Sequence, residues 1–181
     1  ASLILLSLIS FINPAAKERV IDQTINQMNL NKDQEKAYIF SREHTHHYIT
    51  AYRMFLDHKI LGVGVKNFRK FCSDKKYIES RSSCAPHPHN TYVQILAETG
   101  IIGFSFLILV LIYFCIYIFK HFILRIKSKY YFNDFEICIL SGIAIYLWPF
   151  IPTGNIFSNW LNIAMILNLP LLIWSIKSIK S

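Results

Sequence analysis

The stretch HNTYVQILAETGIIGFSFLILVLIYFCIYIF, residues 89–119, decides the fold of this chain. It joins a polar pair, His89 and Asn90, to an apolar run over 101–119 that contains no charged residue. Nineteen helical residues extend roughly 28 Å, about the thickness of the hydrocarbon core of a bilayer. We therefore expect a transmembrane helix over 91–119 whose first turns stand in water.

The start of this helix places polar groups at the membrane surface. A helix N-terminus offers free backbone N–H groups and the positive end of the helix dipole, which stabilise a bound anion. Pro86 and Pro88 are expected to hold His87 and His89 in extended backbone, which would fix the direction of His89. The arrangement favours chemistry on a lipid-linked phosphate or diphosphate.

The composition is that of a membrane protein, with 53% hydrophobic and 15% aromatic residues. The apolar start has neither an initiator Met nor a basic leader, so we interpret the chain as the C-terminal piece of a longer protein. The predicted segments are the end of a truncated transmembrane helix at 1–12, a large periplasmic loop at 13–90, a transmembrane helix at 91–119, a cytoplasmic loop at 120–134, a transmembrane helix at 135–151, a short periplasmic turn at 152–159, a transmembrane helix at 160–176 and a cytoplasmic tail at 177–181.

The net charge of +8 indicates topology rather than nucleic-acid binding, because the basic residues cluster beside the spans. Lys and Arg crowd 120–134 and follow the last span, whereas 152–159 carries none. The positive-inside rule places the basic segments in the cytoplasm and leaves 13–90 outside, periplasmic in a Gram-negative cell. The predicted location is thus the bacterial inner membrane, crossed several times.

Within the large loop, periodic apolar residues predict a weak amphipathic helix over 15–27 and a second helix over 44–58. Cys72 and Cys84 share this loop and could close a disulfide in an oxidising compartment. Sequence spacing alone does not establish the geometry of that bond, so the pairing stays open.

Charged and titratable side chains are frequent in the same loop. Its histidines show neither an HExxH helix nor a compact Cys/His set, so we expect no metal site and no cofactor. Its arginines carry guanidinium groups suited to bidentate contact with phosphate oxygens. Glu98 lies two turns into the long helix, where packing and the orientation of an Arg or His are favoured over direct acid catalysis.

Several motifs resemble the O-antigen ligase and polymerase superfamily of polytopic bacterial membrane proteins. In order along the chain they are Tyr48 with Ala51, Phe55, Leu61-Gly62-Val63-Gly64, Asn67-Phe68, and His89-Asn90 followed after nine residues by Gly100-Ile101-Ile102-Gly103. The resemblance implies an all-α integral membrane fold, a GT-C-like helical bundle fragment with a large helical periplasmic loop. It also implies a metal-independent glycosyltransferase that moves a glycan from an undecaprenyl diphosphate carrier to an acceptor hydroxyl, which in ligases belongs to lipid A-core.

The resemblance also implies roles for individual residues. His89 would act as the catalytic base, with Asn90 beside it, because an imidazole suits proton transfer at neutral pH. His87 and Glu98 would orient the site. Where relatives commonly have Arg, this chain has His44, so the candidates for holding the diphosphate are Arg42, Arg53, Arg69 and His44. We expect the chain to be inactive without further N-terminal helices.

The sequence leaves two alternatives open. The first is a polymerase of the same superfamily, which extends the glycan on its carrier. The second is a non-catalytic membrane protein whose His-rich loop binds metal or senses pH. A transporter is less favoured because the predicted spans carry almost no ionisable residues. The expected partners are therefore a lipid-linked glycan donor, a lipid A-core or other glycan acceptor and the membrane, with no nucleic acid.

Overall fold

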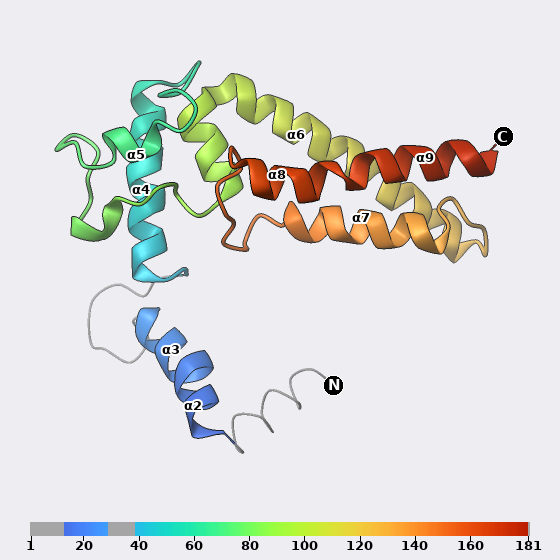
Figure 1. The fold of residues 1–181 in the computed structure, drawn as a ribbon, viewed down its shortest axis with the longest axis horizontal. Helices are drawn as coiled ribbons and strands as arrows, with labels where there is room; N and C mark the ends of the chain where they lie inside the picture. Colours follow the sequence, from blue (N-terminus) through green and yellow to red (C-terminus); the bar gives the residue numbers. More distant parts are fainter. Residues whose placement is uncertain (1–12, 29–38, 181) are drawn as a thin grey trace.

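The computed structural model describes residues 13–28 and 39–180, which form helices and loops without any strand. The predicted end of a helix at 1–12 lies outside these residues. Figure 1 shows a head at one end of the molecule and a set of long helices that extends away from it. The head contains α4 (Arg42–Asp57), α5 (Phe68–Phe71), the 3₁₀ turn η2 (Arg81–Ser83) and the beginning of α6 (Thr91–Ile126). The long helices are the rest of α6, α7 (Asp134–Tyr146), α8 (Asn159–Ile166) and α9 (Asn168–Lys180).

A separate helical segment precedes the head. It consists of α2 (Pro14–Lys17), the π-helical stretch η1 (Glu18–Asp22) and α3 (Gln23–Gln27). This segment confirms the helix predicted over 15–27.

The helix α6 is long and apolar enough to cross a membrane by length and composition, and it has no equal in this respect among the described residues. It continues to Ile126, so the first seven residues of the segment predicted as a loop at 120–134 are helical. Lys and Arg are good helix formers, so basic residues do not end the helix. Their long side chains can extend from the end of an apolar helix to the membrane–water interface. Lys120 lies 4.4 Å from the ring centre of Tyr131, and Arg125 lies 4.3 Å from that of Tyr130.

The other two predicted spans are shorter than expected. The helix predicted at 135–151 ends at Tyr146, because Pro149 disfavours helical backbone at Trp148. With 13 residues α7 extends about 20 Å, which is less than a bilayer core.

The span predicted at 160–176 is interrupted at Leu167, which separates α8 from α9. Pro170 follows the break and has no N–H with which to continue the helical hydrogen bonds across it. The helix α9 runs to Lys180, so it includes most of the predicted tail, and it packs against α7.

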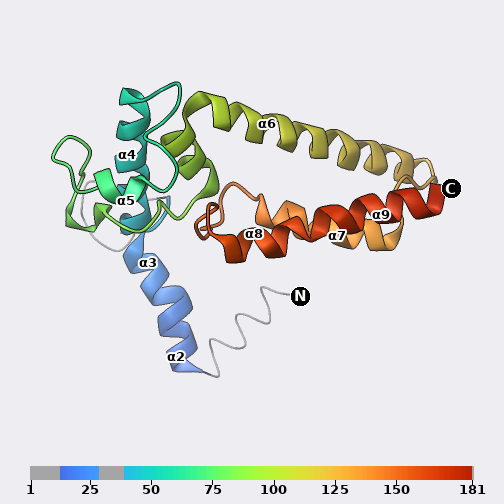
Figure 2. The same ribbon diagram turned by 45° about the horizontal axis from the view of Figure 1, so that its top comes forward.

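A kink at Gly100 divides α6 into a short segment in the head and a long apolar segment, and the bend is visible in Figures 1 and 2. Gly100 has φ +64°, a left-handed value that glycine adopts without strain. The helical hydrogen bonds that the kink removes are replaced by the loop 59–64, which lies across the break. Val63 N and Gly64 N donate to the carbonyls of Ala97 and Glu98 at 3.0 and 2.9 Å.

In a second pair of hydrogen bonds, amides of α6 donate to carbonyls of the loop. The amides of Ile101 and Ile102 donate to the carbonyls of Lys59 and Ile60, at 2.8 and 3.4 Å. Two carbonyls and two amides on either side of the kink therefore have partners in the loop. We call the loop 59–64 the splint, because it bridges the two segments of α6 and holds the head against the long helices.

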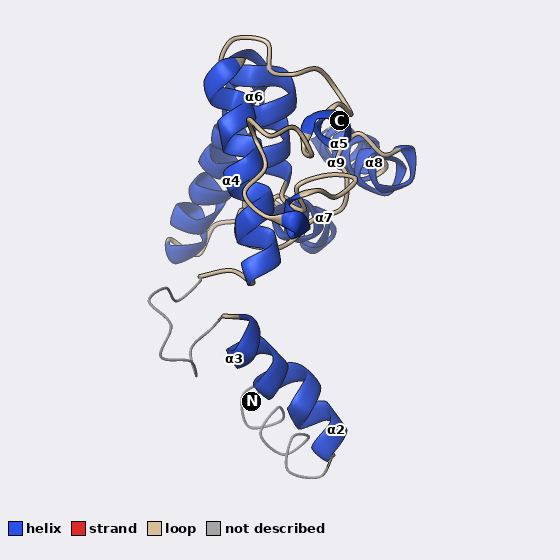
Figure 3. Ribbon diagram, turned by 90° about the vertical axis from the view of Figure 1, so that its left-hand side faces the viewer, coloured by secondary structure: helices blue, strands red, loops and turns tan. Residues whose placement is uncertain are grey.

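The helix α4 forms the centre of the head and confirms the helix predicted at 44–58. Ser41 caps it by accepting a hydrogen bond from His44 N. Its buried face packs against the first segment of α6, and Figure 3 shows the two helices from the head end. The core of the head consists of Ala51, Met54, Phe68, Cys72, Tyr77 and Ala97.

Cys72 and Cys84 form a disulfide, with Cα atoms 5.0 Å apart. The structure thereby confirms the pairing that the sequence left open. The bond closes residues 72–84 into a covalent loop. Ser83, the neighbour of Cys84 in this loop, is fully buried where η2 packs against α4. The loop that carries η2 is thus fixed to the core of the head.

Removal of this disulfide is expected to destabilise the head by about 2–3 kcal/mol, because the unfolded segment regains the freedom that the bond denies it. The measurement is the melting temperature of the Cys84→Ser variant in detergent. Cys115→Ser is the matched control, since Cys115 is a free, exposed cysteine. Equal melting temperatures for Cys84→Ser and wild type would contradict a stabilising role.

Candidate functional site

His89 occupies an unusual backbone conformation at the entrance to α6. Its φ is +60°, in the left-handed region, so the prediction of extended backbone is wrong for this residue. The restriction imposed by a following proline applies to His87, whereas His89 precedes Asn90. Histidine tolerates left-handed backbone better than most residues, and strained backbone is concentrated at functional sites. The amide of Thr153 donates to the carbonyl of His89 at 2.9 Å and holds this geometry.

Asn90 fixes the start of α6 directly after His89. Its Oδ1 accepts from Tyr92 N and Val93 N at 3.0 and 3.1 Å, which is the pattern of an N-cap. Its Nδ2 donates to the carbonyl of Pro149 at 2.8 Å, so the loop after α7 is tied to the same point. Because Asn90 is buried and bonded at both ends of its amide, the geometry favours a positioning role over contact with a reacting group.

Four histidine rings meet at this point. The ring centre of His89 lies 4.2 Å from that of His87, 5.5 Å from that of His44 and 5.6 Å from that of His47. His44 and His47 lie 6.3 Å apart, one turn from each other on α4. We call these four residues the histidine cluster. The structure therefore brings together three residues predicted for the site, His44, His87 and His89, and adds His47.

Hydrogen bonds fix the protonation of two of these rings. His47 Nδ1 lies 2.9 Å from the carbonyl oxygen of Ser83, and a carbonyl only accepts, so Nδ1 carries the hydrogen. His87 Nε2 donates in the same way to the carbonyl of Thr153, at 3.3 Å. In the neutral state, Nε2 of His47 and Nδ1 of His87 are therefore the bare, basic nitrogens.

The environment favours neutral imidazoles in the absence of a ligand. Burial, together with the neighbouring rings of His87, His44 and His47, lowers the pKa of His89 from 6.5 to about 4. Burial likewise lowers the pKa of His44 and of His87. A lowered pKa means that the proton is lost before neutrality is reached, so His89 is an uncharged proton acceptor at pH 7.

The candidate arginines lie in three different settings. Arg53 donates to the carbonyls of Tyr77 and Ile78 and forms an ion pair with Glu79, so its guanidinium is engaged in holding the loop. It also stands nine residues beyond His44 on α4, about 13 Å along the helix axis.

Arg42 and Arg69 are both exposed. Arg69 belongs to α5, whereas Arg42 lies in the first turn of α4, two residues before His44. Of the three arginines on the candidate list, Arg42 is thus the one nearest in sequence and helix position to the histidine cluster.

Glu98 is fully buried beneath the splint. Its carboxylate accepts from Lys66 N at 3.0 Å, from Phe68 N at 2.9 Å and from Gln94 Nε2 at 3.1 Å. The same Nε2 of Gln94 donates to Asn155 Oδ1 at 2.8 Å, which extends the network to the loop before α8. The hydrogen bonds of Glu98 thus orient loop backbone, where the sequence had suggested an Arg or His side chain as the partner.

Glu98→Gln is expected to destabilise the protein by about 1–3 kcal/mol, because an amide replaces one accepting oxygen with a donor that faces a backbone N–H. Thermal unfolding in detergent measures the change. Glu18→Gln, at an exposed position on η1, provides the control and is expected to melt with wild type. If Glu98→Gln also melted with wild type, the carboxylate would have no part in holding the loop.

Within residues 13–28 and 39–180, no group of three or more His, Cys, Asp or Glu side chains is arranged to hold a metal ion.

Sequence reasoning missed His47, Ser83 and Thr153. The spacing of His44 and His47, three residues apart, was the one signal that placed His47 on the same helical face as a site residue. Ser83 and Thr153 act through backbone atoms, which leave no signature in residue type.

No curated protein and no solved structure matches the chain. A family model described as O-antigen ligase matches residues 1–108, which include α4, the splint, the histidine cluster and the kink at Gly100. The family is one of membrane proteins, and the apolar helix α6 agrees with this. The family also indicates an enzyme of the glycosyltransferase type. Because the match covers more than half of its 181 residues, the chain belongs to the O-antigen ligase family.

Proposed function

We propose that this protein transfers a glycan from an undecaprenyl diphosphate carrier to an acceptor hydroxyl, and that the acceptor is lipid A-core. In the reaction, the acceptor oxygen forms a bond to the anomeric carbon of the glycan. The bond between that carbon and the diphosphate breaks, and the lipid diphosphate leaves with the electron pair. His89 takes the proton that the acceptor hydroxyl loses.

The observation that carries this proposal is the position of His89. It is a half-buried imidazole with no hydrogen bond to its ring nitrogens from the described residues, at the N-terminus of α6. Its pKa of about 4 keeps it neutral and able to accept a proton at pH 7. The N-terminus of α6 adds a positive potential at the place where the leaving group gains negative charge.

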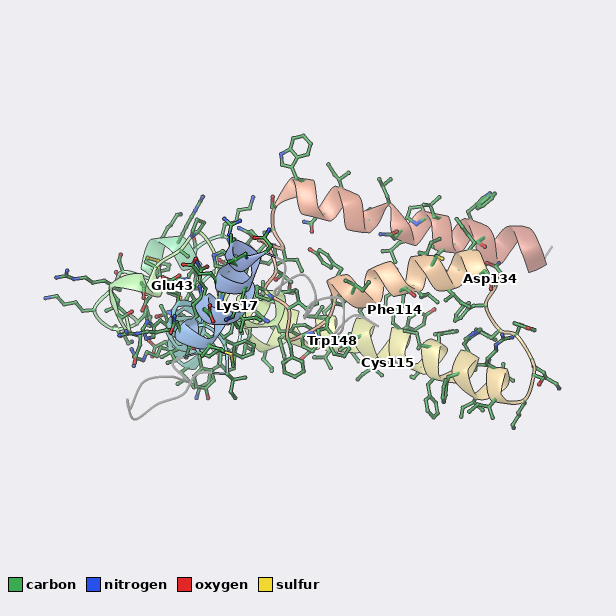
Figure 4. All side chains as sticks on the ribbon, turned by 90° about the horizontal axis from the view of Figure 1, so that it is seen from below. Lys17, Glu43, Phe114, Cys115, Asp134 and Trp148 are labelled. Atoms are coloured by element: carbon green, nitrogen blue, oxygen red, sulfur yellow. A yellow bond between two sulfur atoms is a disulfide. The ribbon has the colours of Figure 1, made fainter. Side chains whose placement is uncertain are left out.

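The arrangement of charge supports a periplasmic site in the inner membrane. Figure 4 shows Glu43 and Asp134 at opposite ends of the molecule. Glu43 lies in the first turn of α4, and Asp134 is the first residue of α7. The connection between α6 and α7, with Lys127 and Lys129, therefore lies far from the histidine cluster. If the basic end faces the cytoplasm, the cluster faces the periplasm.

The proposal is tested by expressing the complete gene in a bacterial strain that lacks its glycan ligase. Restored glycan on lipid A-core would support the ligase assignment. The alternative within the family is a polymerase, which uses a carrier-linked glycan as acceptor. It would leave lipid A-core bare in this strain, and its deletion from the native host would remove long polymer instead of accumulating it on the carrier lipid.

A further inference from the structure

We propose that His44, His47 and His87 bind the diphosphate of the lipid-linked donor by taking up protons as it arrives, while His89 stays neutral. This inference rests on the proposed function, and it adds a binding role for His47 and His87. The donor diphosphate joins a lipid to a sugar and carries two negative charges that do not titrate near neutral pH. Those charges must be balanced when they leave water.

Fixed positive charge is scarce at the histidine cluster. Arg53 is held by Glu79 and by two loop carbonyls. Arg69 is exposed on α5, which leaves Arg42, two residues before His44 on α4, as the candidate arginine nearest to the cluster in sequence, and its positive charge acts on His46. One guanidinium balances one charge of a diphosphate dianion. The remaining charge favours proton uptake by the nearest titratable groups, which are imidazoles.

Basic nitrogens are available on two of the rings. Because His47 donates through Nδ1 and His87 donates through Nε2, each ring keeps its other nitrogen unprotonated in the neutral state. Protonation of that nitrogen leaves the existing hydrogen bond intact and creates a second donor on the same ring. The cluster can therefore become cationic without moving a side chain. His44 lies in the first turn of α4, where the helix N-terminus also favours an anion.

The rings become charged in a definite order. His89 lies within 5.6 Å of the other three ring centres, and each of them opposes a positive charge on it. His44 has the carboxylate of Glu43 nearby, and His87 has that of Glu98, and each carboxylate favours the charged imidazole. His44 and His87 therefore gain protons before His89, and their positive charge keeps His89 unprotonated.

The test is calorimetric titration of the protein from its complete gene, in detergent, with farnesyl diphosphoryl N-acetylglucosamine. Titrations in buffers of different ionisation enthalpy give the number of protons taken up on binding. We expect uptake of about one proton or more at about pH 6.5, and a Kd that rises at least about tenfold between about pH 6 and pH 8. The sign follows from the lowered pKa values: the ligand must raise them, so binding weakens as protons become scarce.

Two variants keep the hydrogen bonds of the cluster and remove the titrating nitrogen. In His47→Asn the amide nitrogen can replace Nδ1 as donor to Ser83, and in His87→Gln it can replace Nε2 as donor to Thr153. Each is expected to take up fewer protons and to show a flatter dependence of Kd on pH. His44→Arg supplies a permanent charge and is expected to bind at about pH 8 nearly as tightly as at pH 6. His58→Gln, exposed at the far end of α4, should behave as wild type.

The outcomes separate this inference from the proposed function. Tight binding without proton uptake would overturn the inference and leave the glycosyltransferase assignment standing. Unchanged proton uptake in both His47→Asn and His87→Gln, at wild-type melting temperature, would also overturn it. Absence of binding by folded wild type at every pH would count against the diphosphate donor itself, and therefore against both.

Discussion

Replacement of His89 by Asn is expected to lower the rate of glycan transfer by about 10²–10⁴-fold, the usual contribution of a general base. Asn tolerates left-handed backbone, so the φ of +60° can be kept while the proton acceptor is removed. The measurement is the initial rate of transfer from a lipid-linked donor to lipid A-core, at equal abundance of enzyme in the membrane.

Binding of the donor distinguishes loss of the base from loss of the site. Because His89 stays neutral when the diphosphate binds, His89→Asn should bind the donor with a Kd within a fewfold of wild type. His58 lies at the C-terminal end of α4, outside the histidine cluster, so His58→Asn should transfer glycan at the wild-type rate. A transfer rate for His89→Asn within threefold of wild type would exclude His89 as the base.

Gly100→Ala is expected to destabilise the protein by at least about 3 kcal/mol. A Cβ at this position would lie 2.3 Å from the carbonyl oxygen of Ile60 and 2.7 Å from the amide of Gly62. Both neighbours are backbone atoms of the splint, which cannot rotate away. An alanine would also have to adopt φ +64°.

The expected result is a sharply reduced amount of folded Gly100→Ala protein in the membrane, with a lower melting temperature in detergent. Gly62→Ala should behave alike, because its Cβ would lie 2.3 Å from the carbonyl carbon of Glu98. Gly142→Ala is the matched control, since no atom lies within 4 Å of the added Cβ. That control should be neutral or more stable, as expected for Ala in a helix. Wild-type stability of Gly100→Ala would show that the splint does not bind α6 as described.

The motif around His89 predicted the entrance to α6 because its information is local. An Asn that caps a helix and a long uncharged run each act within a few residues, so residue type alone identifies them. The helix α4 followed from its periodic apolar face in the same way. The lengths of the later helices did not, because the effect of Pro149 and the interruption at Leu167 depend on backbone geometry beyond the apolar pattern.

The histidine cluster could be predicted only in part. His44 and His89 are 45 positions apart, and their approach depends on the packing of α4 against α6 and on the crossing of Gly62 over Gly100. The chemistry of Arg53 predicts a diphosphate ligand, but the sequence does not reveal that its guanidinium forms an ion pair with Glu79. Residue type reported what each side chain can do, whereas tertiary contacts decided which of them are available.

The disulfide between Cys72 and Cys84 has a consequence for when the protein becomes competent. It restrains the segment whose Ser83 carbonyl orients His47, so oxidation and assembly of the site are coupled. Disulfides persist in oxidising compartments and are rare in the cytosol. If the loop is exported as proposed, His47 would gain its Ser83 partner in full only once the loop reaches the side of the membrane where such bonds form.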